Sequence, residues 1–148
     1  MISVSFDEIR IPPGLASRIN PIFKCVLLPE EIGALNAALF ALDLALAEDD
    51  SVPPDHSVNM ILTSTDSFNL VQRNPGVMGH CYHLVVLYVH HWRSQQLPIN
   101  VIAAVILEEF CHHFWRIADE TLVKYKVLEV YRYIDSSVQI QELYRLDP

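Results

Sequence analysis

The feature that most constrains this chain is an apolar segment with four ionisable side chains at its centre, "LEEFCHHFW" at residues 107–115. The residues before it are apolar too, so the segment is typical of a helix that is buried over most of its surface. Carboxylates and imidazoles are costly to bury unless they gain partners. The fold must therefore supply hydrogen bonds or a metal ion to the following side chains: Glu108, Glu109, His112 and His113.

Helical spacing arranges these four residues in two pairs. Residues four apart share a helix face, so Glu108 projects with His112, and Glu109 projects with His113. The second pair is rotated by about 100° from the first. Helices that hold a metal ion use two ligands at i and i+4, with a carboxylate at i+1 beside the attacking water. Positions 108, 112 and 109 have that spacing.

Length and composition indicate one folded domain over residues 1–148. About half of the residues are apolar (51%) and only 19% are charged, which excludes a disordered chain. The formal charge of −8 and the absence of a basic run argue against a nucleic-acid partner. An odd count of three cysteines without a CxxC pair is typical of a reduced compartment.

The N-terminus and the most apolar stretch do not suggest a secreted or membrane-spanning protein. The N-terminus lacks the basic-then-apolar order of a signal peptide. The most apolar stretch, residues 32–47, is short for a membrane span and contains Asn36 and Asp43. We expect a cytoplasmic protein without a membrane partner.

The pattern along the chain predicts an α+β domain. Pro29 suits the first turn of a helix whose apolar positions recur every three or four residues, and residues 48–56 end it. Runs rich in strand formers follow at 58–65, 68–73 and 82–92, with Asp66–Ser67 as a turn. Two helices complete the domain, at 99–118 and at 120–135 with Asp119 as N-cap. We expect a short mixed or antiparallel sheet formed by the residues that lie, in sequence, between the N-terminal helix and these two helices. We also expect a short helix in the tail.

The segment "VILEEFCHHFW" resembles the active helix of the zincin metallopeptidases, whose signature is H-E-x-x-H in an apolar helix. The resemblance gives Glu109 the place of the catalytic glutamate and His112 that of the second histidine ligand, while Glu108 replaces the first histidine. In the gluzincin branch a glutamate on the next helix completes the site. Here that residue would be Glu129 in "KVLEVYRY", 17 positions after His112. The family's further acid is replaced by Tyr133.

This resemblance implies a small zincin-like domain with a degenerate metal site and, where active, a metal-dependent hydrolase of peptide bonds. Glu109 would be the general base, with Glu108, His112 and Glu129 as metal ligands. Zinc is the first choice of ion. Two carboxylates with one imidazole form a harder donor set than zinc usually selects, so another divalent ion is the alternative. The partner would be a peptide or protein substrate.

The alternative is a non-enzymatic interaction domain in which the Glu/His cluster is a hydrogen-bonded polar network without metal. Exposed aromatic residues would favour it, because Trp and Tyr anchor interfaces. An open cleft over Glu109 favours the enzyme, and a sealed one favours the interaction domain. The aromatic candidates are Trp92, Trp115, Tyr131, Tyr133 and Tyr144.

The remaining histidines give weaker indications. His80 and His83 flank Cys81, but on a strand they would point to opposite faces. His90 and His91, adjacent on the predicted strand, would diverge and have separate structural roles. Cys111 does not face His112, so a Cys–His nucleophile is not indicated there. A di-iron bundle would require a second Glu-x-x-His helix, which the chain lacks.

Overall fold

A computed structural model describes residues 6–67, 78 and 83–144. Its helices and strands follow one another in the order η1 (Pro13–Leu15, a 3-10 turn), β1 (Ile19–Phe23), α1 (Pro29–Ala47), β2 (Val58–Thr63), β3 (Leu84–Tyr88), α2 (Val89–Ser94), α3 (Ile99–Phe114), α4 (Glu120–Tyr131) and α5 (Ile140–Leu143). The mixture of helices with a small sheet confirms the α+β class. Within the described ranges, no helix has both the length and the apolar character needed to cross a membrane.

Within the described residues, the sheet has three strands in the order β1-β2-β3, and both pairings are parallel. Ile19 pairs with Val58 at the start of β1 and β2, and Asn59 pairs with Leu84 at the start of β3. The expected mixed or antiparallel sheet was therefore wrong. That expectation rested on a hairpin between 58–65 and 68–73, and the second of these segments lies outside the described residues.

Strand β1 was not predicted. It reads INPIF, and its Pro21 cannot donate a backbone hydrogen bond, which confines such a strand to the edge of a sheet. The strand order places β1 at an edge, next to β2. The proline argued against a strand at these residues, but a strand at the edge of the sheet tolerates it.

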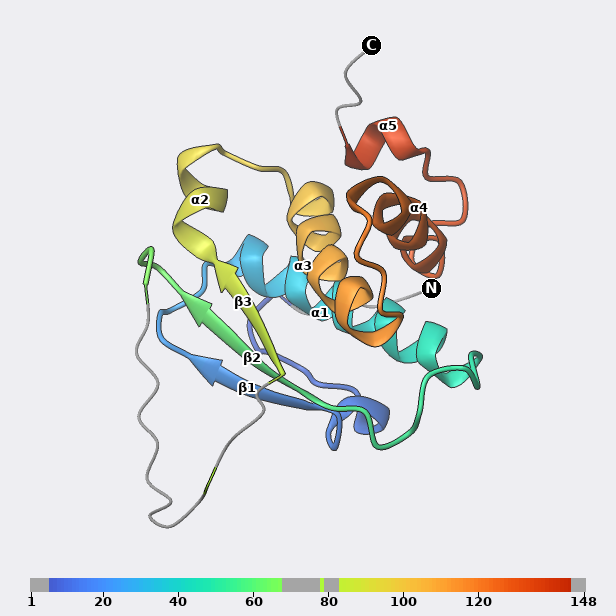
Figure 1. The fold of residues 1–148 in the computed structure, drawn as a ribbon. Coiled ribbons are helices and arrows are strands. Elements are labelled where there is room, and N and C mark those ends of the chain that lie inside the picture. Colours follow the sequence, from blue (N-terminus) through green and yellow to red (C-terminus); the bar gives the residue numbers. More distant parts are fainter. Residues whose placement is uncertain (1–5, 68–77, 79–82, 145–148) are drawn as a thin grey trace.

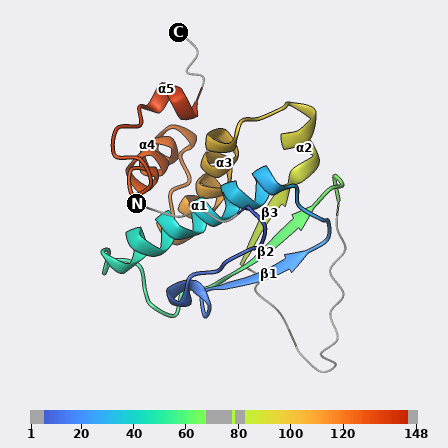
Figure 2. The same cartoon turned by 180° about the vertical axis from the view of Figure 1, so that it is seen from behind.

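The helices gather on one side of the sheet (Figures 1 and 2). Helix α1 packs along α3, and α4 packs on α3 and on α1. Most of α1 is buried, as its predicted apolar stripe requires, with Leu35, Leu39 and Leu42 fully inaccessible to solvent. Helix α3 thus lies between α1 and α4, and only a narrow strip of its surface remains for polar groups.

Helix α1 is joined to α2 by an ion pair between a buried carboxylate and a partly exposed guanidinium. Arg93 donates from Nε and Nη2 to the two carboxylate oxygens of Glu31, at 2.9 and 2.8 Å. The Glu31 side chain is only 4% exposed and also accepts the backbone N–H of Leu28. Arg93 further donates to the carbonyl of Val26. This arrangement fixes the start of α1 against the end of α2.

The predicted strand at 82–92 is wrong in its second half. Strand β3 ends at Tyr88, and helix α2 begins at Val89. A short apolar run does not distinguish strand from buried helix by its period, because neither periodicity is visible in it. His90 and His91 consequently lie at the start of a helix beyond the end of β3.

The two C-terminal helices are confirmed, each shorter than expected. Helix α3 ends at Phe114, where Arg116 adopts a φ of 53° and turns the chain. Asp119 is the N-cap of α4, as predicted, and its Oδ1 accepts the backbone N–H groups of Thr121 and Leu122, both at 2.8 Å. This short connection brings the first turn of α4 back beside the last turn of α3.

Candidate metal centre

The Glu/His cluster lies on the strip of α3 that its neighbours leave uncovered. Apolar residues of the same turns, including Leu107, Phe110 and Phe114, are buried. Glu108 and His112 are half-buried, and Glu109 is exposed. The cluster therefore lies at the rim of the core, where water or a ligand can reach it, rather than inside the core.

The structure brings a third residue, Glu120, to Glu108 and His112. Ligand atoms of these three side chains all lie within 4.8 Å of one another. His112 Nε2 is 3.5 Å from Glu120 Oε2. Glu120 is the first residue of α4, directly after the Asp119 cap. One imidazole and two carboxylates from two helices thus converge on one point.

Glu129, the third ligand expected from the sequence, is not among the side chains that converge there. Its side chain is 66% exposed, and its Oε1 pairs with Lys126 Nζ at 3.2 Å. Glu129 follows Glu120 by nine positions. Nine positions along a helix correspond to a shift of about 13 Å and a half-turn rotation, so one point cannot readily receive both side chains.

His112 is oriented by a hydrogen bond from its other ring nitrogen. Nδ1 contacts the carbonyl oxygen of Ile117, which can only accept, so Nδ1 carries the proton. In the neutral ring this leaves the lone pair on Nε2, the atom that faces Glu120. Histidines that bind metal ions commonly donate their second N–H to a backbone carbonyl in this way.

The charges of Glu108, His112 and Glu120 also act on Glu109, the next residue along α3. Partial desolvation raises the pKa of its carboxyl; the charge of His112 lowers it, and Glu108 and Glu120 raise it further. Glu109 follows Glu108 on α3 and is not one of the three converging residues. Position 109 is the one that the resemblance assigns to a general base.

Tyr144 closes the inner side of the cluster. Its hydroxyl is buried beside Glu108, without a contact of full hydrogen-bond geometry. Burial, followed by the negative charge of Glu108, raises the pKa of this hydroxyl, so it remains a proton donor over the whole physiological range.

A second set of imidazoles adjoins the cluster. The rings of His56 and His113 have centroids 4.4 Å apart, and His83 lies 5.4 Å from His113. His56 and His83 precede β2 and β3, whereas His113 ends α3. With His112, Arg116 and two further residues they line a surface pocket of about 470 Å³.

His113 makes the stability of the fold sensitive to acid. Desolvation, followed by the nearby His56, His83 and Arg116, lowers its pKa to about 4 from 6.5, although a bond to the Ser57 backbone opposes the shift. The unfolded chain therefore binds more protons than the folded chain between pH 6.5 and 4, and stability falls as the pH falls through this window. On moving from pH 7.5 to 5, this site should cost the wild type about 1–2 kcal/mol, allowing for its partial exposure.

The measurement is denaturant unfolding at both pH values, with chelator present. His113→Gln cannot titrate in this range and should lose less stability than the wild type between pH 7.5 and 5. An equal loss in both proteins would show that His113 does not carry the acid sensitivity.

Other residues singled out in the sequence have simpler roles or lie elsewhere. His80 and Cys81 lie outside the described residues. Cys111 is buried, and burial raises the pKa of its thiol far above neutrality, in keeping with an inert apolar filler. His90 and His91 do not diverge as expected, because they begin α2, where their ring centroids are 4.0 Å apart.

Sequence reasoning missed Glu120 as a partner of His112. A signal was present, because Glu120 follows a strong N-cap only eight positions after His112, so a sharp turn brings it back to α3.

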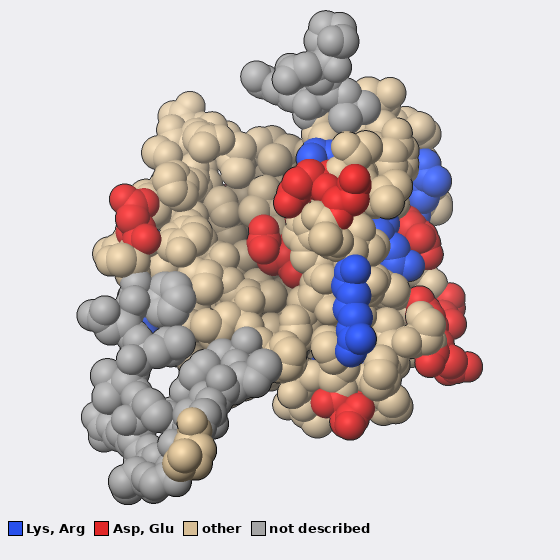
Figure 3. Space-filling model, in the orientation of Figure 1, with Lys and Arg blue, Asp and Glu red and all other residues tan. Residues whose placement is uncertain are grey.

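On the face shown in Figure 3, acidic side chains form several separate groups, and most basic ones lie around α4.

No protein-family model, no curated protein and no solved structure matches the chain.

Proposed function

We propose that this chain is a metal-dependent hydrolase whose divalent ion is held by Glu108, His112 and Glu120. The observation that carries the proposal is the convergence of these three side chains to within 4.8 Å. Three protein ligands with further positions left for water and substrate are typical of catalytic metal sites. Zinc is the first choice, and a harder divalent ion is the alternative because two of the three donors are carboxylates.

The surroundings of the three side chains support this assignment. The Ile117 carbonyl holds the His112 ring so that Nε2 faces Glu120, and the Asp119 cap fixes the helix turn that carries Glu120. Such fixed donors bind a metal ion without having to be ordered first. Two carboxylates brought together without a cation also repel each other, which a divalent ion would relieve.

The reaction requires a base beside the bound ion, and we assign this role to Glu109, the residue after Glu108 on α3. A bound divalent ion would lower the pKa of a water molecule and polarise a carbonyl group. Glu109 would accept the proton from the attacking water and return it to the leaving amine as the C–N bond breaks. Its exposure leaves room for a substrate, and the open pocket beside His112 gives a polypeptide a place to lie. Peptide bonds are the substrate that the zincin resemblance implies.

The aromatic residues that would favour an interaction domain are largely engaged within the fold. Trp92 and Tyr131 are buried. Trp115 is half-buried and donates from Nε1 to Asp49 Oδ2 at 2.7 Å, and the Tyr133 hydroxyl donates to Glu48. The structure offers little of the exposed aromatic surface that the alternative requires from these residues, which supports the hydrolase.

The experiment compares Glu120→Gln with Glu129→Gln as a matched control on the same helix. Tag-free protein is stripped with chelator, reloaded with Zn²⁺ or Mn²⁺ and incubated with an unfolded protein substrate. Cleavage and metal affinity should fall at least tenfold in Glu120→Gln and stay unchanged in Glu129→Gln. Equal behaviour of the two variants, or no cleavage by the reloaded wild type, would overturn the proposal.

A further inference from the structure

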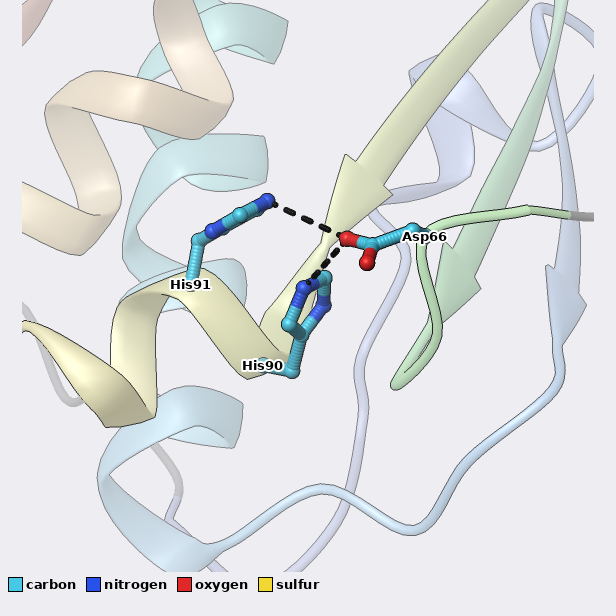
Figure 4. A group of neighbouring side chains, drawn as sticks. All are labelled: Asp66, His90 and His91. Carbon is cyan, nitrogen blue, oxygen red and sulfur yellow. Dashed lines mark ion pairs between the residues drawn. The ribbon is translucent and has the colours of Figure 1, made fainter.

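A second group of metal-ligating side chains lies at the opposite end of the sheet. Asp66 follows β2, and His90 and His91 follow β3. Because β2 and β3 are parallel neighbours, the residues after them emerge at the same edge. Ligand sites in open parallel sheets commonly lie at this carboxyl edge. Figure 4 shows the three side chains pointing toward one another across it.

Both imidazoles approach a single carboxylate oxygen. Asp66 Oδ1 is 2.6 Å from His90 Nε2 and 3.5 Å from His91 Nε2. These ligand atoms all lie within 4.8 Å of one another. Three donor atoms thus lie around one small volume.

The loop that carries Asp66 is held by its own hydrogen bonds. Thr63 is buried, and its Oγ1 accepts the backbone N–H of Thr65 at 3.2 Å and contacts Thr65 Oγ1 at 3.0 Å. Thr65 Oγ1 in turn donates to the carbonyl of Ser67 at 2.7 Å. Asp66 is thus supported on both sides, and helix α2 supports the two histidines.

We infer that Asp66, His90 and His91 form a second metal site, for a first-row divalent transition ion such as zinc. Two imidazole nitrogens and one carboxylate oxygen match the donor sets of zinc and of non-haem iron sites. The Asp66 side chain is 81% exposed, so an ion can enter and keep water ligands.

The site is independent of the proposed hydrolytic centre. That centre lies where α3 ends and α4 begins, and His56 and His83, which line the pocket beside His112, precede β2 and β3 at the amino edge of the sheet. Removing His112 should therefore leave the second site intact. The two proposals can fail separately.

The experiment titrates Zn²⁺ alone into the full, tag-free chain by isothermal calorimetry, using His112→Gln as the background. This background should bind one zinc ion. Adding His91→Gln or Asp66→Asn should weaken that binding at least tenfold, while adding His56→Gln should not change it. The His91 side chain is 55% exposed, so its replacement should leave the melting temperature of the metal-free protein unchanged.

Three outcomes would overturn the inference. The His112→Gln background could bind no zinc, or it could bind zinc equally well after His91→Gln and Asp66→Asn. It could also lose zinc only on His56→Gln, which would place the ion in the pocket beside His112. If the wild type binds two zinc ions and the His112→Gln variant binds one, the lost ion belonged to the proposed hydrolytic centre. The ion that remains supports the second site.

Discussion

Replacing Arg93 by Met should destabilise the protein by about 1–3 kcal/mol, because it leaves the buried Glu31 carboxylate without its cation, although the partial exposure of Arg93 screens the pair. Glu31 is 4% exposed and receives two hydrogen bonds from the guanidinium. The Leu28 N–H remains as a partner, but it cannot neutralise the charge. Met keeps the aliphatic part of the side chain, so the loss reports mainly on the ion pair.

The control is Arg10→Met, which removes an exposed pair. Arg10 and Glu8 are 67% and 66% exposed, and such pairs contribute roughly 0–1 kcal/mol. The free energies of unfolding are measured with denaturant at pH 7 for both variants and the wild type. A loss in Arg93→Met no larger than in Arg10→Met would mean that water or rearrangement satisfies Glu31, and that the pair does not join α1 to α2 energetically.

The elements that surround the site could be predicted from the sequence because their signals are local. The apolar spacing of 32–46 gave α1, and Asp119 gave the start of α4 to the residue. The pairing of strands is not local. Parallel neighbours are joined by long connections, so nothing near β2 indicates that β1 and β3 flank it in the same direction. In addition, the proline in β1 hid this strand, and the apolar residues of α2 hid the point where β3 ends and α2 begins.

The candidate site likewise has a local part that the sequence predicts and a non-local part that it does not. The i, i+4 spacing placed Glu108 with His112, and the structure brings both into one cluster. The third side chain depends on where α4 crosses α3, which follows from the turn at Arg116 and the short connection to Asp119. Glu129 was expected because the gluzincin resemblance requires a glutamate on the next helix, whereas Glu120 is the carboxylate that this turn brings to His112. His90 and His91 were expected to diverge on a strand, but the strand ends at Tyr88, two residues before His90.

Glu108→His should raise the zinc affinity of the proposed hydrolytic centre at least tenfold. The substitution restores the H-E-x-x-H pattern and gives two imidazoles and the Glu120 carboxylate, the donor set of His₂Glu catalytic zinc sites. It also removes one of two neighbouring carboxylates, and zinc prefers the softer imidazole nitrogen. Calorimetry with Zn²⁺ in a His91→Gln background, where the second proposed site is disabled, measures the change.

The role of Glu109 can be separated from metal binding in the same protein. Glu109→Gln should leave the zinc affinity of the Glu108→His variant within about twofold, since Glu109 is outside the converging group, and should reduce cleavage by about 10²–10⁴-fold through loss of the base. If Glu108→His stays folded and binds zinc no better than the wild type, position 108 does not face a metal ion and the zincin resemblance fails. If zinc binding improves without any cleavage that depends on Glu109, α3 and α4 hold a metal ion that serves structure rather than hydrolysis.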